Sequence, residues 1–315
     1  MSDISVTDKY MLQRLKIKHL HLLVELADRH SVAEVAASMN VTQPAVSKML
    51  ADLESGLGMA LFERVGRNIR PTSYGECLIR HAREVLAAMR CAHDEMRALA
   101  GGVAGRVNIG MLGVAAPVLM PNAIRLLKNS WPGITVKLRE GTMDQHLPEL
   151  RAGTIDIIVG RLIKELRTTD LAEEVLYNDP VVIVVAANHP LAKRRKIEWR
   201  DLNGVPWILP PEEAPLHGRL LALLARHGVD APTDVVESVS MLTNLPLLLS
   251  YPALGLLPES VARHHAAART LHILPLQVGP LLGAVGMIWS ANRPPPPAVK
   301  SLQQCLRDVS AAFRP

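Results

Sequence analysis

Apolar positions in residues 31–50 follow a helical repeat that is interrupted once, near residues 39–41. The first helical segment opens with Ser31 three residues before Glu34, the spacing of a capping box at a helix start. Asn40 tolerates the backbone conformation that a tight turn requires. The pattern therefore predicts two short helices joined by a tight turn, the arrangement of a helix-turn-helix.

The second of these helices has a polar outer face. Thr42 is a suitable N-cap for it, and Pro44 falls in its first turn, where the missing N–H costs little. Four apolar residues recur at helical spacing and are expected to pack inward: Val46, Met49, Leu50 and Leu53. The residues left facing outward are Gln43, Pro44, Ser47 and Lys48.

These outward residues, together with Thr42 at the start of the helix, are expected to contact duplex DNA. Gln43 can pair with an adenine edge, Lys48 with guanine acceptors or a phosphate, and the ring of Pro44 can lie against a thymine methyl. An ordinary exposed helix face would carry the same kinds of residue. The capping signals and the small residues of the first helix favour a DNA-reading helix over that alternative.

The sequence here resembles a known family. Residues 42–47 match the recognition-helix signature of the LysR-type transcriptional regulators, and the match continues through Leu57-Gly58, Leu61 to Arg64 and Pro71 to Gly75. The resemblance implies a winged helix-turn-helix at the N-terminal end of the chain. It also implies a two-lobed effector domain, related to periplasmic solute-binding proteins, in the remainder.

The segment from residue 62 to 72 combines positive charge with a turn signal. Gly66 and Asn68 suit the tip of a two-stranded wing, and three arginines surround them: Arg64, Arg67 and Arg70. Cations on a short projection suit phosphates or a minor groove, although a solvated surface would hold them too. The residues expected on the DNA backbone or in a minor groove are Arg64, Arg67 and Thr72, together with Lys18, which the resemblance places near the backbone.

A long helix is predicted next, over residues 75–101. Apolar and small residues recur at alternating steps of four and three: Leu78, Ala82, Val85, Met89, Ala92, Met96 and Leu99. This repeat is typical of a helix that pairs with a second copy of itself. The alternative is a long amphipathic helix that lies on its own domain. The residues that we expect in a dimer interface are Leu78, Val85, Met89, Ala92 and Met96.

The pattern changes after Ala100–Gly105, a run that ends the helix and supplies a joint. The predicted strands are Arg106–Met111, Ile134–Glu140, Ile155–Val159, Val181–Val185, Trp207–Leu209 and Gly283–Trp289. The predicted helices are Pro117–Asn129, Met143–Ala152, Leu216–His227, Met241–Ser250 and Ala298–Phe313. Apolar strands that alternate with helices indicate largely parallel sheets covered on both faces.

The predicted fold is α/β overall: a winged helix-turn-helix, a long linker helix and two Rossmann-like lobes of the type 2 periplasmic-binding-protein kind. The expected boundaries are a tail over 1–13, a DNA-binding domain over 14–74, a dimerisation helix over 75–101, and an effector-binding domain over 102–315. Within the last, lobe I takes 106–178 and 282–315, and lobe II takes 179–281.

Ligands of such two-lobed folds bind beyond the carboxyl ends of strands, where helix N-termini point at them. The residues that this geometry selects are Gly113, Val114, Thr142, Arg161, Leu209, Pro210 and Ser240. Thr142 and Ser240 would equally serve as helix N-caps, and Arg161 as an ion-pair partner on the surface. The loop at residues 112–116 is apolar where the family often has a hydroxyl residue. This difference favours a small organic acid whose carboxylate lies on helix N–H groups and Arg161.

Composition adds a few constraints. The chain has 315 residues, 49% of them hydrophobic, a formal charge of +5 and a pI near 9.2, which suit a globular protein with a polyanionic partner. No apolar stretch is long enough to span a membrane, and the N-terminus has no signal-peptide core. Three widely spaced cysteines indicate neither a disulfide framework nor a zinc site, so we expect a cytoplasmic location.

No spacing of histidines, glycines or nucleophiles indicates a metal, a cofactor or catalysis. The leading interpretation is a ligand-responsive transcription factor that binds promoter DNA as a homodimer or homotetramer. One alternative is an architectural DNA-binding protein without ligand response. The other is a solute-binding or enzymatic module with an appended DNA-binding domain.

Overall fold

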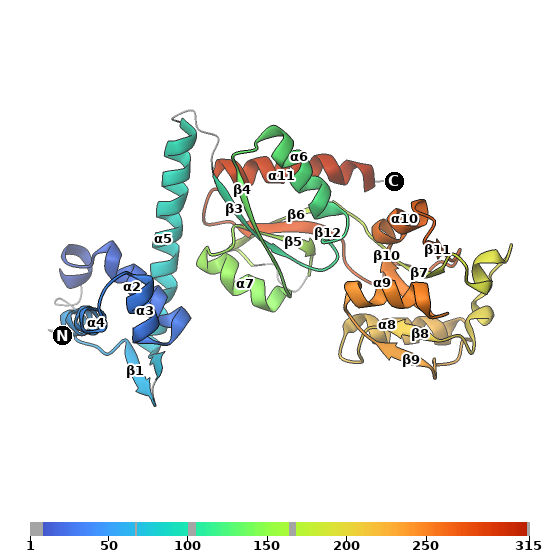
Figure 1. The fold of residues 1–315 in the computed structure, drawn as a ribbon, viewed down its shortest axis with the longest axis horizontal. Helices are drawn as coiled ribbons and strands as arrows, with labels where there is room; N and C mark the ends of the chain where they lie inside the picture. Colours follow the sequence, from blue (N-terminus) through green and yellow to red (C-terminus); the bar gives the residue numbers. More distant parts are fainter. Residues whose placement is uncertain (1–8, 67, 100–104, 164–167, 314–315) are drawn as a thin grey trace. The chain divides into compact units, whose positions relative to one another are not determined.

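A computed structural model describes residues 9–66, 68–99, 105–163 and 168–313 of the chain. The chain forms two compact units. The first comprises Met1–Gly102 with Leu147–Ile155, and the second comprises Val103–His146 with Asp156–Pro315. The elements are labelled along the chain in Figure 1.

The first unit is a winged helix-turn-helix followed by a long helix. Its elements are α2 (Ile17–Arg29), α3 (Val32–Ser38), α4 (Gln43–Leu57), β1 (Phe62–Val65), β2 (Asn68–Pro71) and α5 (Ser73–Leu99). Residues from all three short helices are fully buried in one core: Leu22, Leu23, Leu26, Val35, Val46 and Leu53. Asn40 has a positive φ of 55° in the turn between α3 and α4, as its residue type predicts. The helix-turn-helix is therefore confirmed.

The two predicted caps are formed in part. The Ser31 hydroxyl accepts from the Glu34 N–H at 3.4 Å at the start of α3. Thr42 occupies the N-cap position of α4, but its side chain makes no capping hydrogen bond. Pro44 has no N–H to offer the hydroxyl, and the N–H of Ala45 donates to the Thr42 carbonyl oxygen at 3.0 Å. The proline that marks the helix start thus removes one of the donors that the cap would have used.

The expected tail over residues 1–13 is wrong in its described part. Residues 9–13 are helical, and the Tyr10 hydroxyl donates to the carbonyl oxygen of Asp52 on α4 at 3.4 Å. The Tyr10 ring lies against Gly56, where any added Cβ would collide with it. The glycine is therefore required for this contact, and Tyr10 belongs to the helical domain.

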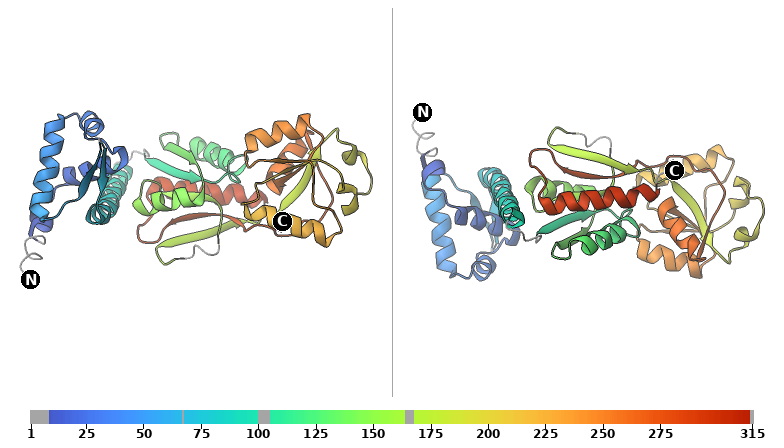
Figure 2. Two further views of the ribbon diagram at one scale, coloured as in Figure 1. Left: turned by 90° about the horizontal axis from the view of Figure 1, so that it is seen from below. Right: turned by 90° about the horizontal axis from the view of Figure 1, so that it is seen from above.

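The second unit contains two five-stranded sheets. The first has the order β4-β3-β5-β12-β6, formed by β3 (Arg106–Met111), β4 (Thr135–Glu140), β5 (Ile157–Arg161), β6 (Leu171–Tyr177) and β12 (Val285–Ser290). Its helices are α6 (Leu119–Ser130), α7 (Met143–Ala152) and α11 (Pro297–Ser310), with a short turn over Ala311–Phe313. Helices α6 and α11 lie side by side on one face of the sheet (Figures 1 and 2).

The second sheet has the order β11-β7-β10-β8-β9. Its strands are β7 (Val181–Ala186), β8 (Trp207–Leu209), β9 (Val235–Glu237), β10 (Leu254–Pro258) and β11 (Leu271–Ile273). The helices around it are α8 (Pro215–Arg226), α9 (Met241–Ser250) and α10 (Glu259–Ala267), with short turns over Pro190–Lys193 and Trp199–Leu202. Trp207 is the largest fully buried side chain and packs in the core beneath α8 with Leu220 and Leu254.

The expectation of largely parallel sheets holds for four of the five strands in each described sheet, which run in one direction, and fails for the fifth. β3 runs parallel to β4 and β5, and β8 runs parallel to β9 and β10. However, β12 is antiparallel to β5 and β6, and β7 is antiparallel to β10 and β11. A crossover helix gives consecutive strands the same direction, but β12 enters its sheet directly from the other lobe. The chain passes between lobes at residues 178–180 (the first crossing) and 274–284 (the second crossing), and neither contains a helix.

Candidate functional site

The outer face of α4 is polar and free of contacts with the domain core. Gln43, Pro44, Ser47 and Lys48 are all exposed, whereas Val46 and Leu53 are fully buried. Met49 and Leu50 are half-buried rather than buried, because they lie at the flank of the core. The predicted division of α4 into an inner and an outer face therefore holds, and the outer face has the side chains that can read base edges.

The end of α4 is fixed to the wing by one carboxylate. Glu54 accepts hydrogen bonds from the backbone N–H groups of Leu61 at 2.7 Å and Phe62 at 3.0 Å. These bonds hold the first residue of β1 against the last turn of α4. Sequence reasoning missed this role, although an acidic residue shortly before a strand is compatible with it.

The wing is a β-hairpin, as predicted. β1 pairs with β2 in antiparallel register with Val65 opposite Asn68, and Gly66 has a φ of +63°, a conformation that favours glycine. Arg64 and Arg70 are exposed on it. The predicted contact residue Arg67 lies outside the described residues.

Thr72 has a structural role in place of the predicted DNA contact. Its hydroxyl donates to the Ala60 carbonyl oxygen at 2.8 Å and accepts from the Gly75 N–H at 3.1 Å. A hydroxyl has one hydrogen to donate, so none remains for a phosphate. Thr72 instead fastens the start of α5 to the loop before the wing.

Lys18 is exposed in the first turn of α2, where the resemblance placed it. The backbone N–H of Lys16 donates to Nδ1 of His19 at 3.2 Å. Burial lowers the pKa of His19, and the charges of Lys18 and Lys16 lower it further. His19 is thus an imidazole acceptor at the N-terminus of α2, between two lysines.

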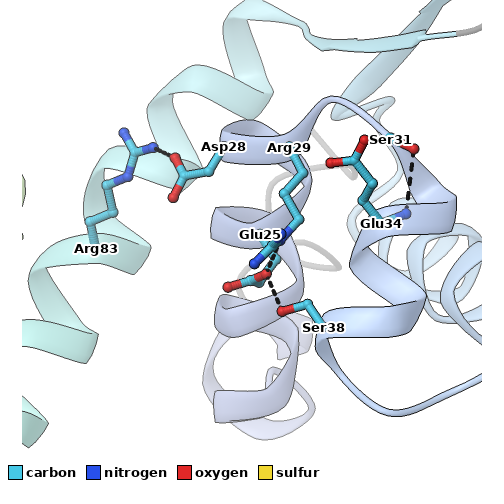
Figure 3. A network of polar contacts seen from close by, with 7 residues as sticks. All are labelled: Glu25, Asp28, Arg29, Ser31, Glu34, Ser38 and Arg83. Carbon is cyan, nitrogen blue, oxygen red and sulfur yellow. Dashed lines mark hydrogen bonds and ion pairs between the residues drawn. The ribbon is translucent and has the colours of Figure 1, made fainter.

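A polar network connects α2 to α3 (Figure 3). The Glu25 carboxylate accepts from Nε of Arg29 and from the Ser38 hydroxyl, both at 2.6 Å. The hydrogen bonds from Ser38 and Arg29 lower the pKa of Glu25. The helix that precedes the turn is therefore tied to α2 by a charged acceptor.

The predicted apolar repeat of α5 divides into two parts. Ala82 is buried with Leu86 against Leu20 of α2, and Leu78 is half-buried against the domain core. Four members further along are exposed: Val85 at 45%, Met89 at 45%, Met96 at 70%, and Ala92. The side chain of Leu99 lies outside the described residues. The alternative of a helix that lies on its own domain accounts for the first part of the repeat. The second part, which we call the exposed seam (Val85, Met89, Ala92 and Met96), is not covered by any of the described residues.

The predicted effector residues all lie where strands end. Gly113 and Val114 follow β3, Thr142 follows β4, and Arg161 ends β5. In the second lobe, Leu209 and Pro210 end and follow β8, and Ser240 follows β9. Leu209 is fully buried and therefore part of the core, whereas Gly113, Thr142 and Ser240 are exposed.

Two of these residues were also expected to cap helices. The Ser240 hydroxyl accepts from the Thr243 N–H at 3.3 Å and from its hydroxyl at 3.1 Å, so this cap is confirmed. At α7 the direction is reversed: the Thr142 N–H donates to the Gln145 side chain at 3.0 Å. The Thr142 backbone, and not its hydroxyl, takes part in the start of α7.

Arg161 is engaged with the backbone of both crossings. Its guanidinium donates to the carbonyl oxygens of Gly283 at 2.6 Å and Asp179 at 2.9 Å, one in each crossing. Burial lowers the pKa of Arg161. The side chain holds both crossings to β5, and its role as ligand for an effector carboxylate stays a prediction. On α8, Nη1 of Arg219 donates to the Leu281 carbonyl oxygen at 2.5 Å and holds the second crossing from the other lobe.

Asp179 connects the first crossing to α10. Its buried carboxylate accepts from the Ser260 N–H at 2.9 Å and the Ser260 hydroxyl at 2.7 Å. Nearby, the Tyr177 hydroxyl is buried without a hydrogen-bond partner among the described residues, and burial together with the Asp179 charge raises its pKa. Sequence reasoning placed the boundary between the lobes at residue 179 but missed the contact of Asp179 with Ser260, which is 81 positions away.

Within the described residues, no group of three or more His, Cys, Asp or Glu side chains is placed to hold a metal ion. None of the helices in that part of the chain is both long and apolar enough to cross a membrane. Cys77 is exposed, Cys91 half-buried and Cys305 buried.

Family comparisons cover almost the whole chain. Residues 17–76 match the bacterial regulatory helix-turn-helix of the lysR family, and residues 100–311 match the LysR substrate binding domain. The chain belongs to the LysR family. It is accordingly a LysR-type transcriptional regulator with a DNA-binding and an effector-binding domain, and its relatives are named as regulators, not enzymes.

Two relatives of this LysR regulator are similar along nearly their full length. It is 32% identical over 298 residues to the regulator PcaQ of Agrobacterium fabrum, covering 95% of this chain and 96% of that protein. It is 30% identical over 302 residues to the regulator GbpR of Azospirillum brasilense, with coverages of 96% and 88%.

Solved structures of LysR regulators share the fold. A full-length OxyR variant from Pseudomonas aeruginosa superposes with a TM-score of 0.71 at 25% identity, covering 94% of this chain and 95% of that one. CbnR, described as a LysR family transcriptional regulator, gives a TM-score of 0.63 at 22% identity, with coverages of 94% and 99%. The α/β fold with an N-terminal helix-turn-helix is thereby confirmed.

Proposed function

We propose that this LysR regulator binds promoter DNA in the cytoplasm as a homodimer or homotetramer and is switched by a small organic acid bound between the lobes of its effector domain. The DNA contacts that we assign are those of Gln43, Pro44, Ser47 and Lys48 on α4, with Lys18 and Arg64 on the backbone or in a minor groove. The observation that carries this assignment is the exposed polar face of α4 in a helix-turn-helix whose opposite face contributes the buried Val46 and Leu53 to the core. A structure of CbnR with its target DNA, at 23% identity and a TM-score of 0.52, shows that the fold is compatible with DNA binding.

Oligomerisation rests on the exposed seam of α5. Large apolar side chains repeated along one face of a helix are stabilised when a second helix covers them. Two recognition helices on one dimer can then reach two half-sites, which raises both affinity and specificity.

The effector assignment rests on the positions of the strand ends. Thr142, Ser240 and the backbone at Gly113 offer hydrogen-bond donors there, and the loop over residues 112–116 offers apolar surface. The carboxylate of the ligand is assigned to helix N–H groups and to the guanidinium of Arg161, which keeps its charge while it donates to two carbonyl oxygens. This set suits a small acid with an apolar body.

The test of DNA binding uses the full-length protein and the region upstream of its own gene. Fluorescence anisotropy would compare the wild type with Gln43→Ala and with Gln277→Ala, an exposed glutamine elsewhere on the chain. Only the first variant should lose affinity. Equal affinity of all three proteins would show that the face of α4 is not the reading surface.

The test of ligand response is calorimetry with a panel of aromatic and aliphatic carboxylates, followed by DNA binding with any ligand found. Ser240→Val and Thr142→Val should weaken binding of that acid, while the exposed Thr233→Val should not. If no carboxylate in the panel binds and none alters DNA binding, the architectural alternative is favoured.

A further inference from the structure

An ion pair joins the linker helix to the DNA-binding domain. Arg83 of α5 donates through Nη2 to Asp28 of α2, a residue 55 positions earlier in the chain (Figure 3). The side chain of Arg83 is 28% exposed and that of Asp28 is 52% exposed. Nε of Arg83 is buried and has no partner among the described residues. The guanidinium is therefore positioned by packing at its base and by the carboxylate at its tip.

The position of Asp28 is unfavourable for α2 alone. It lies in the last turn of this helix, where the helix dipole favours cations such as its neighbour Arg29 and disfavours a carboxylate. A local explanation for an acid at this place is therefore missing, and the Arg83 guanidinium supplies one from another element.

The pair extends an apolar contact along the same face of α2. Leu20, Val24 and Asp28 are spaced by four residues and so lie in one row on the helix. Leu20 is buried with Ala82 and Leu86 of α5, and Val24 packs against this cluster. Leu20 and, in the domain core, Ile79 hold α5 against α2 by apolar packing, which is non-directional. The charged contact one or two turns along the row adds a directional constraint on the angle between the two helices.

The row of Leu20, Val24 and Asp28 connects the helix-turn-helix to α5. Binding of two half-sites by a dimer depends on both. On one side, Ser38 and Glu25 tie α3 to α2, so the helix-turn-helix moves with α2. On the other side, α5 carries the exposed seam. We propose that the Asp28–Arg83 pair sets the angle between the helix-turn-helix and α5, and thereby selects the spacing of DNA half-sites and not their base sequence. This inference rests on the proposed binding of DNA as a dimer.

The experiment uses full-length protein and duplexes that it selects from a random library. The spacer between the two selected half-sites is then lengthened or shortened by one and two base pairs. Each base pair moves a half-site by about 3.4 Å along the duplex and about 35° around it. The wild type should prefer one spacer strongly. Arg83→Ala and the isosteric Asp28→Asn should each flatten this preference by about three- to fivefold, the range expected for loss of one partly exposed ion pair.

Three further measurements separate a positioning role from simple stabilisation. The double variant Asp28→Arg with Arg83→Asp should restore the preference, because it re-forms the pair with the charges exchanged. Arg80→Ala, an exposed arginine on the same helix, should leave the preference unchanged. Affinity for a duplex with a single half-site should be the same in all variants.

The outcomes distinguish this inference from the proposed function. A wild type that binds no duplex with two half-sites would contradict the proposed function itself. A wild type with a clear preference that Arg83→Ala and Asp28→Asn retain, or one that the exchanged pair fails to restore, would overturn the role of the ion pair alone. If Arg83→Ala does not fold, Asp28→Asn still decides the matter, because it removes only the charge.

Discussion

Arg161 reaches across 122 positions of sequence to the carbonyl oxygen of Gly283, to which it donates a hydrogen bond of 2.6 Å. The same guanidinium holds the Asp179 carbonyl oxygen at 2.9 Å. One cation at the end of β5 thus serves both segments that pass between the lobes. Both crossings of the effector domain are therefore held to the end of β5.

Replacing Arg161 by alanine should lower the free energy of unfolding of the effector domain by about 1–3 kcal/mol, because a partly buried carbonyl loses a charged donor. Arg161→Lys should recover part of the loss, since lysine reaches one carbonyl and not both. Urea denaturation followed by tryptophan fluorescence measures the effect. The exposed Arg125→Ala on α6 is the control. If it costs as much as Arg161→Ala, the hydrogen bonds at the crossings are not the cause.

Acid should destabilise the effector domain through His189. Nδ1 of this buried side chain accepts from the Leu191 N–H at 3.1 Å, Nε2 lies 3.3 Å from the Pro252 carbonyl oxygen, and burial lowers the pKa of His189 below its ordinary value of 6.5. The unfolded chain therefore binds the proton more readily than the folded one. The stabilisation is complete above pH 6.5 and is lost as the pH falls below it.

Thermal unfolding measured between about pH 7.5 and pH 5 gives the slope of stability against pH. His189→Gln should reduce this slope. The variant His264→Gln, at an exposed position on α10, should keep the wild-type slope. A His189→Gln protein that loses stability with acid as steeply as the wild type would exclude this histidine as the source.

We expect α4 to determine which base sequence is bound and the wing to contribute affinity that does not depend on sequence. Gln43→Ala should cost about 1–3 kcal/mol at one base position and little at others. Arg64→Ala should weaken binding to all sequences alike and reduce the slope of log affinity against log salt by about one. Binding measured on single-base variants of the operator and over a salt series distinguishes the two. Loss of base discrimination in Arg64→Ala would reverse the assignment.

The exposed seam of α5 should control assembly. Val85→Asp combined with Met89→Asp places two carboxylates in an apolar helix pair, which is stable only if the helices separate. Sedimentation should show fewer subunits per particle, with a parallel fall in DNA affinity. Arg80→Asp changes the net charge by the same amount outside the seam and should leave the oligomer intact. An unchanged particle in the double variant would mean that the seam is not an interface.

Local signals in the sequence predicted the first unit well. Helix periodicity and Pro44 predicted the outer face of α4, and Gly66 predicted the wing. All of these signals lie within a few residues of the structure that they predict. The strands β3 and β8 and the helices α7 and α9 were found at their observed bounds, because apolar runs or helix starts mark them clearly.

The missed elements are β6, β9, β10, β11 and α10. β6 carries Glu173 and Glu174 at the edge of a sheet, so it has no apolar run, and β9 and β11 have three residues each. β10 (Leu254–Pro258) does have an apolar run, which sequence reasoning did not use. The direction of β12 and the role of Arg161 depend on residues far apart in the chain. Asp179 and Gly283 are 18 and 122 positions from Arg161, and no periodicity links them to it.

The position of β12 between β5 and β6 has a consequence for synthesis of the chain. A ribosome that has released the chain up to residue 280 has completed α2 to α5, but β6 still has no strand beside it and the apolar edge of β5 is open. Open apolar edges recruit strands from other molecules. A product truncated before β12 would thus have a complete DNA-binding domain joined to an effector domain that is prone to aggregate. Each copy of the chain can therefore fold without an open sheet edge only after β12 has been translated, and not when the DNA-binding domain is complete.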